Sequence, residues 1–284
     1  MAELWSPICE RLGIKYPIFG FAHDIATVAA ITNAGGYGVY GATRRLPEEI
    51  ESELATLREL VGDNVFGVDL VLPPGMPEHN SRAAIEAEIP QAHKDFVNAL
   101  IDKYQVPAAS GPGMRIRFIR SAEIEREQIR AVLESSVDMF ACGIGAPADV
   151  LVAAKAEGKT TLALIGSPHH VQRALDAGVE ILVAQGYDAG AHTGPIGTYS
   201  LVPQIVEAAG DIPVLVAGGV ATGRHIAAAL AMGAQGVWMG TAWLLSEEHQ
   251  LHMHPVNTKK LIAAGSGDTV ITRSESGKTF RQVR

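Results

Sequence analysis

The sequence predicts an α/β protein, a (β/α)8 TIM barrel with a helical insertion after its third strand. Short apolar runs alternate with amphipathic helical stretches along the chain, which is typical of buried parallel strands joined by crossover helices. The length of 284 residues accommodates one such barrel, for which about 250 residues is typical. The aromatic share is only 6% while small apolar residues are plentiful, which argues against an all-β sandwich.

We expect the apolar runs to form the barrel strands. They span residues 17–22, 37–42, 65–72, 137–143, 160–166, 181–185, 212–217 and 236–239. Helical stretches at 47–61, 147–157, 168–177 and 223–232 provide crossovers. Several of these stretches open with a proline, which suits the first turn of a helix. Because each strand is followed by a helical stretch or a long connection, the pattern predicts a closed barrel.

One connection is much longer than the others. It opens with Pro73-Pro74-Gly75 and contains a charged helical pattern over residues 83–104. Because long loops without structure of their own are uncommon in compact domains, we expect a helical insertion that caps the carboxyl-end mouth of the barrel. The expected division is a barrel domain over 1–72 and 137–246, the insertion over 73–136 and a polar C-terminal extension over 247–284.

The charge balance and the cysteines restrict the class of protein. The formal charge is −8, from 23 basic and 31 acidic residues, which disfavours nucleic acid as a partner. Cys9 and Cys142 fit neither a disulfide framework nor a metal-ligand spacing. Residues 1–16 lack a signal-peptide pattern, and no stretch of about 18 residues is apolar and uncharged. We therefore expect a soluble, cytoplasmic protein without a membrane partner, and a homodimer is compatible with the sequence.

A glycine-rich segment directly follows the sixth predicted strand. In Gln185–Gly194, His192 lies between two small residues. Residues just past the carboxyl end of a barrel strand face the active site, and an imidazole, with a pKa of about 6.5, suits proton transfer near neutral pH. A loop histidine that only bonds the backbone is the alternative. The glycine setting and the strand-end position favour a general base.

Two further glycine groups follow the seventh and eighth predicted strands. They are Ala217-Gly218-Gly219 and Gly240-Thr241. Barrels frequently bind phosphate at these two loops through backbone N–H groups and a helix N-terminus. The pair therefore predicts a site for a mononucleotide phosphate. A dinucleotide fingerprint is absent, since the glycines of residues 35–38 precede a strand instead of following one.

The remaining candidates favour a structural role. Adjacent histidines at 169–170 and a late group, His249, His252 and His254, have no carboxylate or cysteine partner at a metal-binding spacing, so we expect no metal. The pattern places the first pair in the first turn of a helix and the late group in a polar surface loop. Cys142 lies within an apolar strand and is expected to be a core residue.

The segments around these candidates resemble the nitronate monooxygenase family, formerly called 2-nitropropane dioxygenases, whose members are FMN-dependent (β/α)8 barrels. The resemblance is carried most specifically by A-G-x-H-x-G at 189–194 and by A-G-G-x-x-x-G at 217–223. Further matching segments are 16–18, 31–38, 66–70 and 239–241. The resemblance covers most of the chain outside residues 73–136.

The resemblance implies roles for individual residues. His192 matches the catalytic base, and Gly190 matches backbone near the flavin. The matches to the FMN phosphate and ribityl contacts are Ala217, Gly218, Gly219, Gly240 and Thr241. Ala22 and Asp69 match positions beside the flavin at the ends of the first and third strands. The implied cofactor is FMN, and the implied partners are a small-molecule substrate with O2 or NAD(P)H.

Three departures from the family pattern leave the reaction open. The family's first strand commonly ends in Gln-Gly-x-Met, where this chain has Gly20-Phe21-Ala22-His23. Asp69 replaces a common asparagine, and an ionised carboxylate there would disfavour an anionic reduced flavin. The apolar Leu164-Ile165 replaces a lysine often present on strand five.

Three functions are therefore considered. The first is FMN-dependent oxidation of alkyl nitronates, or of a similar acidic carbon substrate, with O2 and with His192 as base. The second is NAD(P)H-linked reduction or dehydrogenation of an acyl thioester of the enoyl-acyl-carrier-protein or CoA type. The third is a barrel that binds a phosphorylated metabolite without redox chemistry. The setting of His192 argues against the third, because a phosphate binder needs no base at a strand end.

Overall fold

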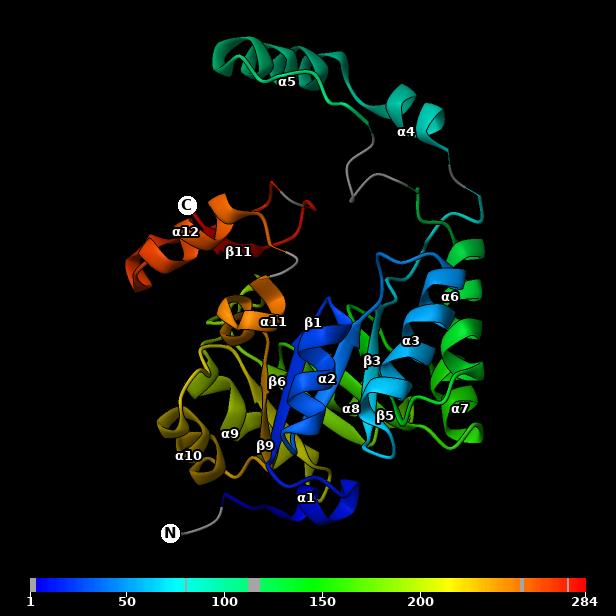
Figure 1. Cartoon of the computed structure of the whole chain (residues 1–284), viewed down its shortest axis with the longest axis vertical. Coiled ribbons are helices and arrows are strands. Elements are labelled where there is room, and N and C mark those ends of the chain that lie inside the picture. Colours follow the sequence, from blue (N-terminus) through cyan, green and yellow to red (C-terminus); the bar gives the residue numbers. More distant parts are fainter. Residues whose placement is uncertain (1–3, 80, 112–117, 251–252, 275) are drawn as a thin grey trace.

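Eight parallel strands close into a barrel in the order β1-β2-β3-β4-β5-β6-β8-β9 (Figure 1). The structure is a computed structural model that describes residues 4–79, 81–111, 118–250, 253–274 and 276–284. The barrel strands are β1 Ile18–Ala22, β2 Tyr37–Gly41, β3 Phe66–Val71, β4 Met139–Gly143, β5 Thr160–Ile165, β6 Ile181–Gln185, β8 Val214–Ala217 and β9 Gly236–Met239. All the predicted strand runs are confirmed, with ends that shift by at most two residues.

Helices surround the barrel and connect its strands. They are α2 Ile25–Asn33, α3 Pro47–Val61, α6 Ala122–Glu134, α7 Ala148–Ala156, α8 Val171–Asp176 after the 3-10 turn η1 Pro168–His170, α9 Thr198–Ala209 and α10 Gly223–Ala231. The four predicted crossover helices are confirmed. Helix α1, Pro7–Leu12, lies across the amino-terminal end of the barrel, opposite the mouth (Figure 1).

Strand residues alternate between two cores, as the pleat requires. Inward side chains fill the barrel with a cluster that includes Phe19, Tyr37, Met139, Leu162, Val183, Leu215 and Trp238. Outward side chains pack under the helices, and Cys142 is among them, 1% exposed, as expected for a core residue. The barrel is therefore a packed interior, and an active site has room only at its mouth.

The long connection between β3 and β4 contains two different kinds of helix. Helix α6 packs against α3, and Gln128 on it donates to the carbonyl oxygens of Thr43 and Arg45. It is therefore the ordinary crossover helix of this βα unit. Pro90 separates helix α4, Arg82–Glu88, from helix α5, Gln91–Tyr104, and neither helix contains a buried residue. Figure 1 shows them beyond the mouth and apart from the barrel, so a role as its cap stays a prediction.

The C-terminal extension returns to the barrel mouth. After η2 Thr241–Leu245, which ends the barrel domain, it contains α11 Glu247–Gln250, α12 Pro255–Ala263, η3 Ser266–Asp268, β10 Thr269–Thr272 and β11 Phe280–Val283. Strand β11 pairs with β10 on one side and with β7, Ala191–His192, on the other. Across the described part of the chain, no helix combines the length and apolarity needed to cross a membrane.

The late histidines differ from their expected place in a surface loop. The Nδ1 atom of His249 on α11 lies 2.6 Å from Oδ2 of Asp24, and both side chains are largely buried. Asp24 also caps α2 by accepting from the Thr27 amide. The pair thus fastens the extension to the first βα unit. His254 caps α12, while His252 lies outside the described residues.

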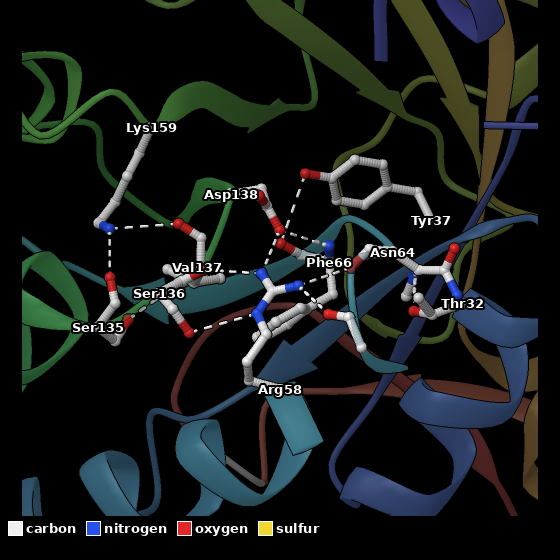
Figure 2. Close-up of polar contacts among 12 residues, drawn as sticks. Thr32, Tyr37, Arg58, Asn64, Phe66, Ser135, Ser136, Val137, Asp138 and Lys159 are labelled. Carbon is white, nitrogen blue, oxygen red and sulfur yellow. Dashed lines mark hydrogen bonds and ion pairs between the residues drawn. The ribbon is translucent and has the colours of Figure 1, made fainter. Parts of the chain in front are cut away.

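The amino-terminal end of the barrel is held by Arg58 of α3 (Figure 2). Its guanidinium lies 2.7 Å from Oδ2 of Asp138 and donates to the carbonyl oxygens of Gly62, Asn64 and Ser136. The same Asp138 oxygen accepts from the Phe66 amide. This cluster joins the loops that enter β3 and β4, at the end of an α/β barrel that serves stability instead of catalysis.

Replacing Arg58 by alanine should destabilise the protein by roughly 2 kcal/mol, because a half-buried carboxylate and several carbonyl oxygens lose a charged donor. Thermal unfolding should show a midpoint lower by roughly 4–8 °C. Arg130→Ala is the matched control, since Arg130 pairs with Glu127 and Glu134 on an exposed helix face and such pairs contribute about 0–1 kcal/mol. Equal midpoints for the two variants would contradict this account of the cluster.

Candidate active site

The carboxyl ends of β6, β8 and β9 meet at the mouth and bring most of the predicted glycines together. A Cβ on Gly190 would lie 2.8 Å from Oγ1 of Thr241. A Cβ on Gly218 would lie 2.9 Å from the amide nitrogen of Ala189. The loop after β6 therefore lies against the loops that follow β8 and β9, with too little space for a side chain at Gly190 or Gly218. We call Gly190, Gly218, Gly219, Gly240 and Thr241 the glycine cradle.

Two side chains that the sequence analysis missed hold the cradle in place. Oδ2 of Asp188 accepts a 2.9 Å hydrogen bond from the Thr198 amide, and this bond lowers the pKa of the Asp188 carboxyl. The Thr198 hydroxyl in turn donates to the carbonyl oxygen of Gly218. Thr198 is the first residue of α9, so the helix that follows β7 fixes the loop that follows β8.

Gly218 has a φ of +105°, a conformation that other residues adopt only with strain. Gly218→Ala should therefore displace the β8 loop and weaken binding of any ligand in the cradle by at least tenfold, since a shift of about 1.4 kcal/mol suffices. Titration with FMN measures this. Gly223→Ala is the control, because the space around its Cβ position is open. Unchanged affinity in Gly218→Ala would show that the cradle does not bind the ligand.

Asp69, Ala217 and Ala22 occupy different positions. Asp69 and Ala217 point into the upper barrel, since they share the inward register with Ala141 and Trp238 respectively. The side chain of Ala22 instead packs outward among residues of the helix layer. Ala22 can therefore line the mouth only through its backbone, whereas the side chains of Asp69 and Ala217 face the mouth.

His192 lies in the short strand β7, above the carboxyl end of β6. Gln185 donates a 2.7 Å hydrogen bond to the His192 carbonyl oxygen, and the Thr193 hydroxyl donates to the carbonyl oxygen of Gly186. Burial, together with the nearby cations Lys278 and Arg44, lowers the pKa of the His192 imidazole. The ring is consequently neutral at pH 7 and can accept a proton.

The C-terminal extension supplies two contacts to His192 that sequence reasoning missed. Ser276 Oγ lies 2.7 Å from Nε2 of His192, and the Phe280 ring meets the imidazole edge-on, with centroids 5.1 Å apart. Residues 269–272 are rich in β-branched side chains and are followed, after a polar segment that contains Gly277, by a second short run at 280–283, which is a weak hairpin signal for these residues. Among the described residues no three His, Cys, Asp or Glu side chains form a metal-binding group.

The fold and the arrangement of the site together indicate a barrel enzyme. A parallel α/β barrel with a glycine cradle at its last two strands and a neutral imidazole at the same end has the layout of a barrel enzyme with its active site at the mouth. The chain belongs to the nitronate monooxygenase family, whose profile matches residues 6–284.

Curated relatives agree with this assignment. A putative monooxygenase of Mycobacterium tuberculosis is 39% identical over 98% of this chain and 76% of its own length. A probable nitronate monooxygenase of Staphylococcus saprophyticus is 31% identical over 99% of this chain and 79% of its own length. The protein is therefore an oxidoreductase.

Solved structures share the fold. FabK from Thermotoga maritima superposes with a TM-score of 0.76 at 25% identity, over 98% of this chain and 74% of that one. The nitroalkane oxidase of Streptomyces ansochromogenes superposes with a TM-score of 0.74 at 24% identity, over 98% and 78% of the two chains. The second likeness shows the (β/α)8 barrel alone.

Proposed function

We propose that the protein is an FMN-dependent oxidoreductase that oxidises alkyl nitronates, or a similar acidic carbon substrate, with O2. The observation that carries the proposal is the neutral imidazole of His192, two residues from Gly190 of the glycine cradle, with its backbone bonded by Gln185 and its Nε2 atom bonded to Ser276. Membership of the nitronate monooxygenase family supports it. FMN, when bound, supplies the electron-accepting chemistry, and the protein supplies position and a base.

The residues at the mouth fit FMN in two respects. The cradle lets backbone approach a ligand where Cβ atoms at Gly190 and Gly218 would collide with neighbouring loops, so its amides would hold the phosphate and the ribityl chain without a lysine. Oδ2 of Asp69 is buried and has no hydrogen-bond partner among the described residues, so a polar atom of the ring system could bond there.

When the substrate arrives as a neutral nitroalkane, His192 would take its α-proton and so form the nitronate that is then oxidised. The Nε2 atom of His192 is within hydrogen-bond distance of Ser276 Oγ. When Nε2 carries the ring proton and donates a hydrogen bond to this hydroxyl, Nδ1 is the nitrogen that can accept a proton. The edge contact with Phe280 restricts rotation of the ring. The imidazole is thus oriented before substrate enters, which is what an efficient general base requires.

The acyl-thioester reaction remains a second candidate because of α4 and α5. Exposed apolar side chains, Phe96, Val97, Ile101 and Tyr104, lie on α5 beyond the mouth, where they could contact a bulky carrier. The likeness to FabK agrees with this alternative. An enoyl reductase domain of MlnA from Bacillus amyloliquefaciens, at 15% identity, shares the fold alone.

Anaerobic titration of the flavin-loaded protein separates the candidates. The proposal predicts that an alkyl nitronate bleaches the flavin absorbance and that O2 restores it, while NADH and NADPH reduce it only slowly. Rapid reduction by NADH or NADPH, accelerated by an enoyl thioester, would instead establish the second candidate. A protein that binds FMN but responds to neither reductant would contradict both.

A further inference from the structure

Asp69 is an acidic side chain whose neighbours on the adjacent strands are small. It lies on β3 between Gly41 of β2 and Ala141 of β4 in the strand register. A Cβ on Gly143 would lie 3.7 and 3.8 Å from the two carboxylate oxygens. Because Gly143 has no side chain, this face of the carboxylate is not covered by β4.

No described residue partners the Asp69 carboxylate. The side chain is 5% exposed, and its buried Oδ2 has no hydrogen bond. The titratable residues near Asp69, His23 and Cys142, do not neutralise its charge. His23 bonds the Gly41 carbonyl oxygen, and the Cys142 thiol has a raised pKa through burial and the charge of Asp69.

The nearby arginines also bond elsewhere. Arg45 pairs with Glu53, and Arg120 bonds Glu125 and the Val71 carbonyl oxygen. An unpaired buried carboxylate is strongly disfavoured in its ionised form. Burial accordingly raises the pKa of Asp69 to about 7. The neutral acid in turn has an O–H that lacks an acceptor among the residues that the structure describes.

We propose that Asp69 acts as a neutral carboxylic acid whose O–H donates a hydrogen bond to the bound flavin, so that ionisation of Asp69 weakens flavin binding. The inference rests on the proposed function, because it takes FMN as the ligand of the mouth. A flavin ring offers carbonyl oxygens and unprotonated ring nitrogens as acceptors. Asp69 is thereby a specificity-determining residue, because it favours a ligand that places a hydrogen-bond acceptor next to its carboxyl group in the upper barrel.

The affinity of the apoprotein for FMN should depend on pH through this one group. If only the protonated form binds tightly, the fraction of competent protein at about pH 8.5 is roughly one in thirty for a pKa of about 7. Fluorescence quenching of FMN by wild-type apoprotein should therefore show a Kd roughly thirtyfold higher at about pH 8.5 than at about pH 5.5, beyond any change that Asp69→Asn shows. Ionisation of the FMN phosphate affects both proteins equally, because both bind the same ligand. Comparison of wild type with Asp69→Asn therefore removes its effect on Kd.

Gly143→Ala is the matched steric variant. Its methyl group would make ordinary contacts with both oxygens of Asp69 and with Val71, so the fold should persist while access to the acid is lost. We expect FMN affinity at least tenfold lower at both pH values. Infrared difference spectra of wild type against Asp69→Asn, recorded without flavin, should show the carbonyl band of a protonated acid that disappears between about pH 6 and 8.

The outcomes separate the inference from the proposed function. Equal pH dependence in wild type and Asp69→Asn, tighter wild-type binding at high pH, or absence of the protonated-acid band would overturn the role of Asp69 even if FMN binds. Failure of every variant to bind FMN at either pH would overturn the proposed function as well. In that case the infrared band would still report whether Asp69 is neutral.

Discussion

His192→Ala should lower kcat on a neutral nitroalkane by about 10²- to 10⁴-fold, the usual contribution of a positioned general base. The loss should be much smaller on the corresponding preformed nitronate, because its carbon acid is already deprotonated. Flavin content should be unchanged, since the cradle is formed by other residues. Steady-state oxygen consumption with the two substrates measures this difference.

Ser276→Ala is the control for His192. It keeps the imidazole and removes one hydrogen bond to Nε2, so we expect a decrease in kcat of about 2- to 12-fold, the equivalent of about 0.5–1.5 kcal/mol. Because the pKa of His192 is lowered, activity on the nitroalkane should rise through a midpoint below about 6.5 and stay level above it. Full nitroalkane activity in His192→Ala would exclude this residue as the base.

In the flavin-free protein, the free energy of unfolding of wild type should fall relative to that of Asp69→Asn as pH rises. Asp69 has a folded-state pKa of about 7, against about 3.9 for an exposed aspartate, so the native state binds the proton more tightly than the unfolded state. Its favourable contribution is complete below about pH 4 and is lost as pH rises to about 7. Above that pH the difference between the variants should have changed by about 4 kcal/mol.

Urea unfolding of apoprotein at several pH values measures this change. The asparagine amide adds a constant offset, so the pH dependence of the difference is the quantity to compare. Asp188→Asn serves as the control with opposite sign, because the pKa of Asp188 is lowered by its bond from Thr198 and its stabilising effect grows with pH. A wild-type stability that does not fall relative to Asp69→Asn between about pH 4 and 7 would contradict a neutral Asp69.

The barrel could be predicted from sequence because its signal is local. Each strand is a short apolar run bounded by turn residues, and the crossover helices between them show helical periodicity. The sequence predicts one insertion over residues 73–136, because the length of that connection does not show where a crossover helix begins. Only the packing of helix α6 on α3 shows that this helix belongs to the barrel.

The site was predictable where backbone chemistry marks it. Gly218 and Gly240 follow strands whose order in the barrel places their loops together, so position alone indicated a cradle. Ser276 could not be found in this way, since it meets His192 across 84 residues of chain, through pairing of β11 with a two-residue strand. The raised pKa of Asp69 could not be predicted either, because it results from burial of the carboxyl in the folded barrel.

Titration of the purified apoprotein with FMN and with riboflavin, followed by absorbance and calorimetry, tests most directly whether the glycine cradle binds a flavin phosphate. We expect one FMN bound per chain, much weaker riboflavin binding because riboflavin has no phosphate for the cradle to hold, and loss of that preference in Gly218→Ala. Stoichiometric binding of neither flavin, or equal affinity for both, would contradict a phosphate-binding glycine cradle at the mouth of this barrel.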